Sequence, residues 1–496
     1  MRTLTLFGLA LAASTASHAA MECAALTHFS IPDMKVVIKS ARLVPAAAPL
    51  PAHCRADGMI NERIGADGKT YGIGFGIALP NDWNERFLFQ GGGGYNGLVR
   101  PPVGVAAVGG NPGLARGFAV VSTDSGHQSD AVFDRSYDVD QQASIDFAHF
   151  AVGDVAVVAK KIVAEYYGQP AQYSYFTGCS TGGREAMLMT QRYPSYFDGV
   201  VSGDPAIHVS YSGIGNAWLR AAFNEAAPKD DKGRPQPHLL FSESDKQLVT
   251  QGVLDACDAG DGLEDGMVFN PNACSFDSEA LLCSGAKNDS CLAPNQVAAL
   301  QKGFAGPRNS RGRLIYRMSP NDAGVAAFLP SANPPSANQE LPVSVDVDGR
   351  LFDLIENPLA QLTDTVWTNL STFSGRGGKL IFYHGMADPT FHATDTIDYY
   401  ERMAAANGGK QDVQNWSRYF SVPGMLHCRG GDAALDQFDL LSAVMNWVEK
   451  GVAPESVVAT GEAFPGRSRP LCAYPKYARY TGNGNSEDAR NFVCRE

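Results

Sequence analysis

Short apolar runs alternate with amphipathic stretches over the first 205 residues of the chain. Residues 71–79 alternate large apolar side chains with small ones, a pattern typical of a strand. After a turn, residues 86–90 (RFLFQ) predict a second strand, and residues 117–124 (GFAVVSTD) predict a central one. Residues 141–167 have the apolar spacing of a long amphipathic helix. This order of strands and helices predicts an α/β fold with a mostly parallel sheet.

The next predicted strand leads into the most specific motif of the chain. Residues 173–184 read YSYFTGCSTGGR, an aromatic-rich strand that ends in G-x-S-x-G, and a helical run follows. Glycines flank Ser180 because a sharp strand-to-helix turn needs strained backbone angles and a close approach that a Cβ would block. This is the pattern of a nucleophile elbow. A glycine-rich helix start without a catalytic role is the alternative, so the partners of Ser180 decide between the two.

Two later loops supply the acid and the base that a nucleophilic serine requires. Residues 379–384 (KLIFYH) predict a buried strand, and Asp388 lies just past its end. Residues 419–422 lead into a loop that places His427 before the last long helix. The order Ser, Asp, His along the chain is that of the α/β-hydrolase fold. We therefore predict Ser180 as nucleophile, Asp388 as the orienting acid and His427 as the general base.

A cysteine stands beside the predicted nucleophile and another beside the predicted base. Cys179 precedes Ser180, and Cys428 follows His427. If the side chains of Ser180 and His427 are within hydrogen-bond reach, their sequence neighbours lie near the distance that a disulfide spans. We therefore expect Cys179 and Cys428 to form a disulfide. Cys179 is an alternative nucleophile only in its reduced form, because a bridged sulfur cannot attack.

The Cys-Ser pair, the Asp and the His-Cys pair together resemble the tannase and feruloyl esterase family, over nearly the whole chain after residue 20. The resemblance implies hydrolysis of an ester of an aromatic acid: a hydroxycinnamate such as ferulate, a gallate, or a terephthalate half-ester. We prefer a feruloyl ester, with a tannase or a mono(2-hydroxyethyl) terephthalate hydrolase as alternatives. Cysteine order and the resemblance together suggest five disulfides: Cys23–Cys54, Cys179–Cys428, Cys257–Cys274, Cys283–Cys291 and Cys472–Cys494.

Four consecutive glycines, residues 91–94, follow the second predicted strand. Backbone N–H groups must approach a developing alkoxide closely, and side chains would obstruct them, so we interpret this run as an oxyanion loop. A merely flexible loop is the alternative. We assign Gly93 as one donor, although nothing in the sequence separates it from Gly92, and the N–H of Thr181 as the other.

Two further side chains are candidates for the neighbourhood of the site. Phe391 comes three residues after Asp388 and is a candidate for stacking on the aromatic acyl group. His127 follows the central strand and could be mistaken for the base. Because it precedes the elbow, it contradicts the expected order, and we predict a structural or pocket-lining role for it.

The alternation of strands and helices stops after residue 205. Residues 206–373 contain four cysteines, many prolines and short mixed segments, at the place where hydrolases of this fold insert a lid. We therefore divide the mature chain into a first core part (21–205), a lid domain (206–373) and a second core part (374–496). The lid is expected to select the substrate. Its aromatic residues Phe352, Trp367 and Phe373 either line a pocket or belong to the core.

An acidic loop lies within the predicted lid, at residues 257–267 (CDAGDGLEDGM). Aspartates separated by glycines suit a hard, oxygen-seeking cation, although the spacing is not that of an EF-hand. A solvated acidic turn is the alternative. A calcium loop of the resembled family favours Ca²⁺ in a structural role, since the loop is far in sequence from the predicted triad. The resemblance implies carboxylate ligands from Asp258, Asp261 and Asp265 and carbonyl ligands from Leu263 and Met267.

The net charge indicates which classes of partner the protein has, and the N-terminal segment indicates where the protein is located. The 496 residues have a formal net charge of −12, which argues against a nucleic-acid surface and does not favour anionic membranes. Residues 1–20 combine a basic start, a short apolar run and small residues, which is typical of a secretory signal peptide. The apolar run is too short to span a bilayer. We expect a soluble protein that is secreted or periplasmic, where disulfides persist.

The sequence thus predicts a secreted serine carboxylic-ester hydrolase of α/β-hydrolase fold, with a large inserted, disulfide-bonded, calcium-binding lid domain. Its expected partner is a small aromatic ester, free or attached to a plant polymer, and its oligomeric state is not set by the sequence. Two other classes compete: an inactive, calcium-stabilised binding protein and a serine peptidase. The presence of Ser180, Asp388 and His427 argues against the first, and cleavage of peptides but not esters would support the second.

Overall fold

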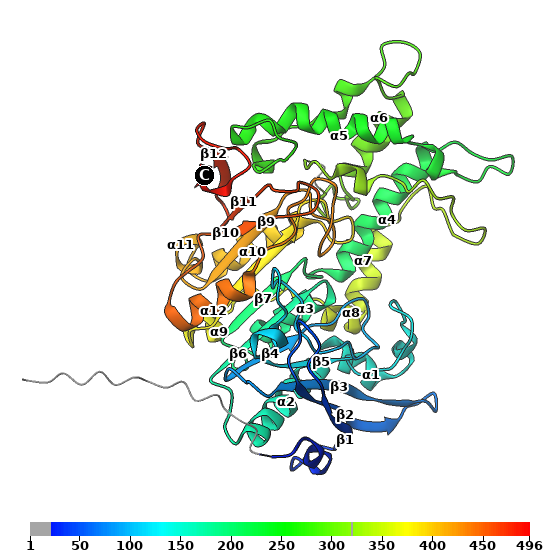
Figure 1. Ribbon diagram of the computed structural model, residues 1–496. Helices are drawn as coiled ribbons and strands as arrows, with labels where there is room; N and C mark the ends of the chain where they lie inside the picture. The colour runs from blue at the N-terminus through cyan, green and yellow to red at the C-terminus, as the bar shows by residue number, and fades with distance from the viewer. Residues whose placement is uncertain (1–20, 319–320) are drawn as a thin grey trace, which may run out of the picture.

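The computed structural model describes residues 21–318 and 321–496, and a nine-stranded sheet runs through its centre (Figure 1). The signal peptide predicted at residues 1–20 lies outside the described residues. β1, β2, β3 and β5 pair antiparallel, and β5, β4, β6, β7, β8 and β9 pair parallel. In spatial order the strands are β1 (Val36–Val44), β2 (His53–Ile64), β3 (Thr70–Pro80), β5 (Ala119–Thr123), β4 (Arg86–Gln90), β6 (Tyr173–Cys179), β7 (Gly199–Gly203), β8 (Lys379–Gly385) and β9 (Ser417–Val422).

Side chains of the central strands alternate between two hydrophobic clusters, one on each face of the sheet. In β4, Phe87 and Phe89 belong to one cluster and Leu88 to the other. Helices α2, α3 and α10 contribute to the first cluster, and α12 to the second. The chain is therefore a mixed α/β fold with helices on both faces of a large sheet, as the alternation predicts. The core helices are α1 (Gln141–Ile145), the π-helix η4 (Asp146–Phe150), α2 (Ala151–Tyr167), α3 (Thr181–Gln191), α10 (Ala393–Ala406), α11 (Lys410–Val413) and α12 (Leu440–Lys450).

The N-terminal part contributes to the sheet, although no strand is predicted there from the sequence. After the short helix η1 (Cys23–His28), residues 23–51 supply the edge strand β1, which pairs with β2. Along β1 only Ile38 is buried, and most of the other side chains are partly or fully exposed. An edge strand that buries so little shows a weak period-2 pattern, which explains why the sequence did not reveal it.

Residues 206–373 add no strand to the sheet in the part of the chain that the structure describes, and they form a helical layer with its own hydrophobic cluster. Figure 1 shows this layer, coloured green to yellow, beyond the strand ends of the sheet. The C-terminal end of α3 contacts the last part of this segment: Gln191 donates to the carbonyl of Thr365 at 2.9 Å, and Arg192, just after the helix, donates to that of Leu362 at 2.6 Å. The helices of this segment are α4 (Val209–Ala226), α5 (Glu243–Cys257), α6 (Pro294–Phe304), α7 (Val347–Glu356), α8 (Pro358–Thr363) and α9 (Ser371–Gly375).

The C-terminal tail packs back on the core through two small antiparallel sheets. β10 (Ser456–Ala459) pairs with β11 (Arg469–Cys472), and β12 (Tyr477–Tyr480) pairs with β13 (Phe492–Arg495). Across residues 21–318 and 321–496, none of the helices has the length and apolar character needed to cross a membrane.

All ten cysteines are paired, and the pairs are those that cysteine order and the family resemblance suggested. Four disulfides are local, with sequence separations between 8 and 31 residues. The fifth joins residues 249 positions apart and connects the two parts of the core. The pairs are Cys23–Cys54, Cys179–Cys428, Cys257–Cys274, Cys283–Cys291 and Cys472–Cys494.

Candidate active site

Ser180 occupies a strained turn between β6 and α3. Its φ is +65°, in the left-handed region that side chains rarely adopt. A Cβ at Gly178 would collide with the carbonyl oxygen of Gly182, and a Cβ at Gly182 would lie 2.7 Å from the carbonyl oxygen of Gly92. Both glycines of the motif are therefore required for the close packing of strand, helix and glycine loop. The turn places Ser180 at the N-terminus of α3, as expected for a nucleophile elbow.

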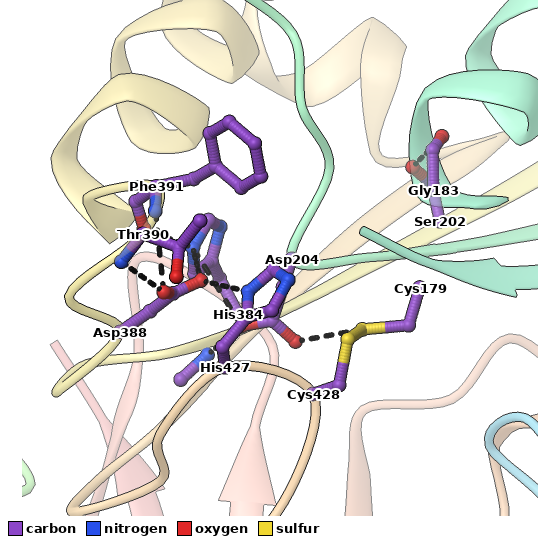
Figure 2. Close-up of a disulfide and its surroundings, with 11 residues drawn as sticks. Cys179, Gly183, Ser202, Asp204, His384, Asp388, Thr390, Phe391, His427 and Cys428 are labelled. Atoms are coloured by element: carbon purple, nitrogen blue, oxygen red, sulfur yellow. Dashed lines mark hydrogen bonds and ion pairs between the residues drawn. A yellow bond between two sulfur atoms is a disulfide. The ribbon is translucent and has the colours of Figure 1, made fainter. Parts of the chain in front are cut away.

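Asp388 and His427 come together from the loops after β8 and β9 (Figure 2). His427 Nδ1 lies 2.7 Å from Asp388 Oδ2. Because an ionised carboxylate only accepts, Nδ1 carries the proton and Nε2 is left free to accept one. The other oxygen of Asp388 accepts the backbone N–H groups of Thr390 at 2.7 Å and Phe391 at 3.2 Å. The carboxylate is completely buried, whereas a quarter of the His427 side chain is exposed.

The hydrogen bond between Asp388 and His427 shifts the pKa of both groups. Burial alone would raise the pKa of the Asp388 carboxyl, but hydrogen bonds with His384 and His427 outweigh burial and hold that pKa well below its ordinary value. Burial alone would lower the pKa of His427, but its hydrogen bond with Asp388 outweighs burial and raises the pKa above its ordinary value. Asp388 is therefore ionised near neutral pH, and His427 is a stronger base than a free imidazole.

A disulfide anchors the turn of Ser180 to the loop of His427. The Cα atoms of Cys179 and Cys428 are 5.9 Å apart, within the usual range for a disulfide. Each cysteine is the direct neighbour of one predicted catalytic residue. Figure 2 shows the bridge beside His427 and Asp204. The two loops are therefore joined covalently at the point where the predicted nucleophile and base must meet.

A second buried carboxylate and a second histidine lie behind the first pair. Asp204 follows β7, is completely buried and lies 3.3 Å from the sulfur of Cys179. His384, in β8, lies between the two carboxylates, with Nε2 3.3 Å from Asp388 Oδ2 and 3.6 Å from Asp204 Oδ1. Burial raises the pKa of Asp204 to about 6. Neither residue is marked by a motif, and the only signal in the sequence is that each lies at or near the end of a predicted strand.

The glycine loop packs against the first turn of α3. The hydroxyl of Thr181 donates to the carbonyl oxygen of Gly94. The N–H of Gly93 donates to the side-chain oxygen of Asn96 at 2.9 Å, and the N–H of Gly92 to Glu185 at 2.8 Å. The loop is therefore fixed by hydrogen bonds, unlike a flexible loop. Gly93 and Thr181 stay predictions as oxyanion donors, and the N–H of Gly93 has an internal partner.

Phe391 and His127 differ in their relation to the predicted triad. The ring of Phe391 lies 5.5 Å from the ring of His427, so it borders the exposed side of the base. His127 is buried, and its ring packs 4.3 Å from that of Tyr137. Burial lowers the pKa of His127 to about 4, so it stays neutral. This environment is consistent with the structural role predicted for His127.

The acidic loop of residues 258–267 holds buried carboxylate oxygens that lack protein partners. One oxygen each of Asp258 and Asp265 is buried without a hydrogen bond in the described structure. Burial, together with the charge of Asp265, raises the pKa of Asp261 to about 7. The other oxygen of Asp265 pairs with Arg469. Unsatisfied, crowded carboxylates of this kind fit the donor set of a divalent cation such as Ca²⁺.

Comparisons with known proteins identify the family of the chain. The family described as "Tannase and feruloyl esterase" matches residues 54–357 and 343–495. The chain is 38% identical to the mono(2-hydroxyethyl) terephthalate hydrolase of Piscinibacter sakaiensis, over 90% of this chain and 86% of that protein. It is 29% identical to feruloyl esterase B of Aspergillus niger, over 84% of this chain and 82% of that protein.

A solved structure extends the similarity to the fold. Feruloyl esterase B from Aspergillus oryzae superposes with a TM-score of 0.78 at 26% identity, over 95% of this chain and 99% of that chain. Because 95% of the chain is covered, the match includes most of the central sheet and most of residues 206–373. The chain therefore belongs to the tannase and feruloyl esterase family and is a carboxylic ester hydrolase.

Proposed function

We propose that the protein is a serine esterase that is exported from the cytoplasm and cleaves esters of aromatic acids through an acyl-enzyme. The proposed architecture is an α/β-hydrolase core, residues 21–205 and 374–496, with residues 206–373 as a lid. The observation that carries the proposal is the Asp388–His427 pair, which a disulfide ties to the turn of Ser180. Export, to the periplasm or beyond the cell, is supported by the five disulfides, which persist in oxidising compartments.

The proposed mechanism uses the three side chains in sequence. His427 Nε2 takes the proton of the Ser180 hydroxyl as the oxygen attacks the ester carbonyl, and Asp388 holds the imidazolium that forms. Backbone N–H groups stabilise the oxyanion, each contributing about 3 to 4 kcal/mol. His427 then protonates the leaving alcohol. A water molecule, activated by the same histidine, releases the acid and restores Ser180.

The substrate class follows from the relatives. We propose a feruloyl or related hydroxycinnamoyl ester, free or attached to a plant polymer, because feruloyl esterases occur among both the relatives and the solved structures. A terephthalate half-ester is the second candidate, favoured by the 38% identity to the Piscinibacter sakaiensis enzyme. Phe391 is proposed to stack on the aromatic acyl group, since its ring borders the exposed side of His427.

We further propose that residues 258–267 bind a structural Ca²⁺. The carboxylates of Asp258, Asp261 and Asp265 would hold the ion together with the carbonyls of Leu263 and Met267. The unpartnered oxygens of Asp258 and Asp265 support this ligand set. The ion would neutralise carboxylates that otherwise repel one another and would fix the loop to which Cys257 and Cys274 are bridged. It supplies no step of the ester reaction.

A substrate panel tests the proposed function. Purified protein and Ser180→Ala are incubated with methyl ferulate, chlorogenate, methyl gallate, mono(2-hydroxyethyl) terephthalate and a short p-nitrophenyl ester. We expect preferential release of ferulate or caffeate, reduced at least 10³-fold by the substitution. Preferential cleavage of the terephthalate half-ester would select the second candidate. Absence of turnover in folded, oxidised protein would overturn the esterase proposal in favour of a binding protein.

A further inference from the structure

A buried carboxylate on the nucleophile helix binds the glycine loop. Glu185 lies just over one turn after Ser180 in α3, and 1% of its surface is exposed. Its Oε2 accepts the N–H of Gly92 at 2.8 Å. Its Oε1 accepts the side-chain amide of Asn96 at 2.6 Å and the hydroxyl of Ser125 at 2.9 Å. Both oxygens of one carboxylate therefore hold the loop and the residue after β5.

Steric contacts hold the loop and the helix at a fixed distance. A Cβ on Gly91 would lie 2.7 Å from the Cα of Gly182, so the two backbones touch where glycines face each other. Asn96 adopts a φ of +57°, and this turns its side chain back over the loop. The contact between the Thr181 hydroxyl and the carbonyl oxygen of Gly94 lies on the same face. The glycine loop and the helix of Ser180 are thus one packed unit.

Most backbone N–H groups of the glycine loop have a hydrogen-bond partner. The N–H groups of Gly92 and Gly93 donate to the side chains of Glu185 and Asn96. That of Gly91 donates to the carbonyl of Thr177, and those of residues 95–97 donate to other backbone carbonyls. Between residues 91 and 97, the N–H of Gly94 alone lacks a partner in the part of the chain that the structure describes. Gly94 is also the loop residue whose carbonyl oxygen Thr181 contacts.

We propose that Glu185 is a positioning residue of the esterase reaction, which fixes the glycine loop on the nucleophile helix so that the N–H of Gly94, beside that of Thr181, faces the oxyanion. This inference rests on the proposed acyl-enzyme mechanism of Ser180. It also replaces Gly93 with Gly94 as the loop donor. A preorganised donor stabilises charge that exists only in the transition state, so losing the clamp lowers kcat and leaves KM nearly unchanged.

The clamp requires a side chain with two acceptor oxygens. Three donors converge on Glu185, and a carboxylate can accept all of them. A glutamine has one acceptor oxygen, and its NH₂ group must face either the N–H of Gly92 or the donors of Asn96 and Ser125. Glu185→Gln therefore keeps the volume of the side chain but breaks the clamp on one side.

The test compares Glu185→Gln with Asp245→Asn in the oxidised full-length mature protein. Asp245 is a matched control, because it is also buried and also accepts a backbone N–H, from Ser242, and a side-chain amide, from Gln296. It lies in residues 206–373, outside the proposed machinery. For Glu185→Gln we expect kcat to fall about 10- to 100-fold with KM changed less than about twofold. Asp245→Asn is expected to lower the melting temperature without changing kcat.

Boronic acid affinity is a measurement that would not change if Glu185 had only a structural role. An arylboronic acid adds to the serine oxygen and forms a tetrahedral anion, so it senses the oxyanion donors. Its affinity should fall by the same factor as kcat in Glu185→Gln, while inhibition by the product acid stays constant. If Glu185→Gln is not recovered folded, Ser125→Ala removes one donor and should lower kcat and boronate affinity in parallel, about two- to fivefold.

The outcomes separate this inference from the proposed function. Absence of turnover in the unsubstituted protein overturns the esterase mechanism itself. Turnover there, with kcat and boronate affinity both unchanged in Glu185→Gln or in Ser125→Ala, overturns the positioning role while the mechanism stands. A rise in KM at constant kcat likewise overturns it, because it would assign Glu185 to substrate binding.

Discussion

The end of the sheet that carries the predicted triad and the acidic loop differ in how their buried carboxylates are satisfied. Asp388 and Glu185 use both of their oxygens in hydrogen bonds with protein groups. Asp258 and Asp265 each keep one buried oxygen without a protein partner. Burying an unpaired carboxylate oxygen is costly, so the first region satisfies its carboxylates with protein groups, whereas the second has the unpaired oxygens that motivate the proposed cation site. The difference predicts which substitutions affect the reaction and which affect only stability.

The largest effect is expected from the acid of the predicted triad. In Asp388→Asn the amide cannot accept the Nδ1 proton in the same way, so His427 loses the tautomer that the reaction requires. We expect kcat to fall about 10⁴-fold. Steady-state kinetics with the best ester of the panel measure this. A fall of less than tenfold in a folded variant would mean that another acid, such as Asp204, orients His427.

Removing the long disulfide should affect both stability and activity. The Cys179–Cys428 bridge closes a 249-residue separation, and the chain-entropy relation gives about 5 kcal/mol for its contribution to the free energy of unfolding. The Cys283–Cys291 bridge closes a separation of 8 residues, for which the same relation gives about 2 to 3 kcal/mol. Denaturant unfolding of the two Cys→Ala double variants measures this difference. We expect kcat to fall only in the first, and equal activities would show that the bridge does not position the site.

Removing the proposed Ca²⁺ should lower stability and leave activity nearly unchanged. Dialysis against a chelator is expected to lower the melting temperature by about 5 °C, because a ligand that binds only the folded state stabilises it. Re-addition of Ca²⁺ should restore the melting temperature. Activity at 25 °C should stay within about twofold, since the proposed ion has a structural role only.

Asp258→Asn provides the matching variant for the calcium prediction. It should lower the melting temperature before dialysis and reduce the further loss on chelation. A melting temperature that does not respond to chelator in the unsubstituted protein would identify residues 258–267 as a metal-free acidic turn.

The smallest expected effect is a shift in the pH profile. His427 must be neutral to act as base, so kcat/KM falls as pH drops through its pKa, which lies above the ordinary value. The charge of Asp204 contributes to that elevation. Asp204→Asn should therefore lower the pKa of His427 and move the acid limb of the profile to lower pH, with kcat at the plateau changed less than about tenfold. A limb that moves upward or stays fixed would contradict this coupling.

The sequence predicted the features that depend on local pattern. Residues 86–90 form a strand with the predicted bounds, and the elbow, with Ser180 at a positive φ, follows from its two glycines. The pairing of Cys179 with Cys428 was predicted because these cysteines are the sequence neighbours of Ser180 and His427, which must lie close together to react. Each of these inferences used either a short motif or the requirement that two groups lie close together.

The features that the sequence did not predict depend on contacts between distant segments. Asp204 and His384 come close together because β7 and β8 are adjacent in the sheet. In the sequence, Glu185 looks like an ordinary polar residue of a helix. Only the packing of the glycine loop against α3 shows that it is buried. The edge strand β1 was missed because it buries almost nothing. The calcium ligands stay a prediction.

The bridge between Cys179 and Cys428 also defines a covalent ring. The ring encloses the whole of residues 206–373, so a single proteolytic cut in one of its exposed loops would not release a fragment. The proline-rich stretch at 330–342 is largely exposed and is the kind of site that proteases attack. A nicked molecule would keep both parts of the core joined beside Ser180 and His427. If the protein is exported as proposed, this topology makes the loss of a single peptide bond in the insertion tolerable.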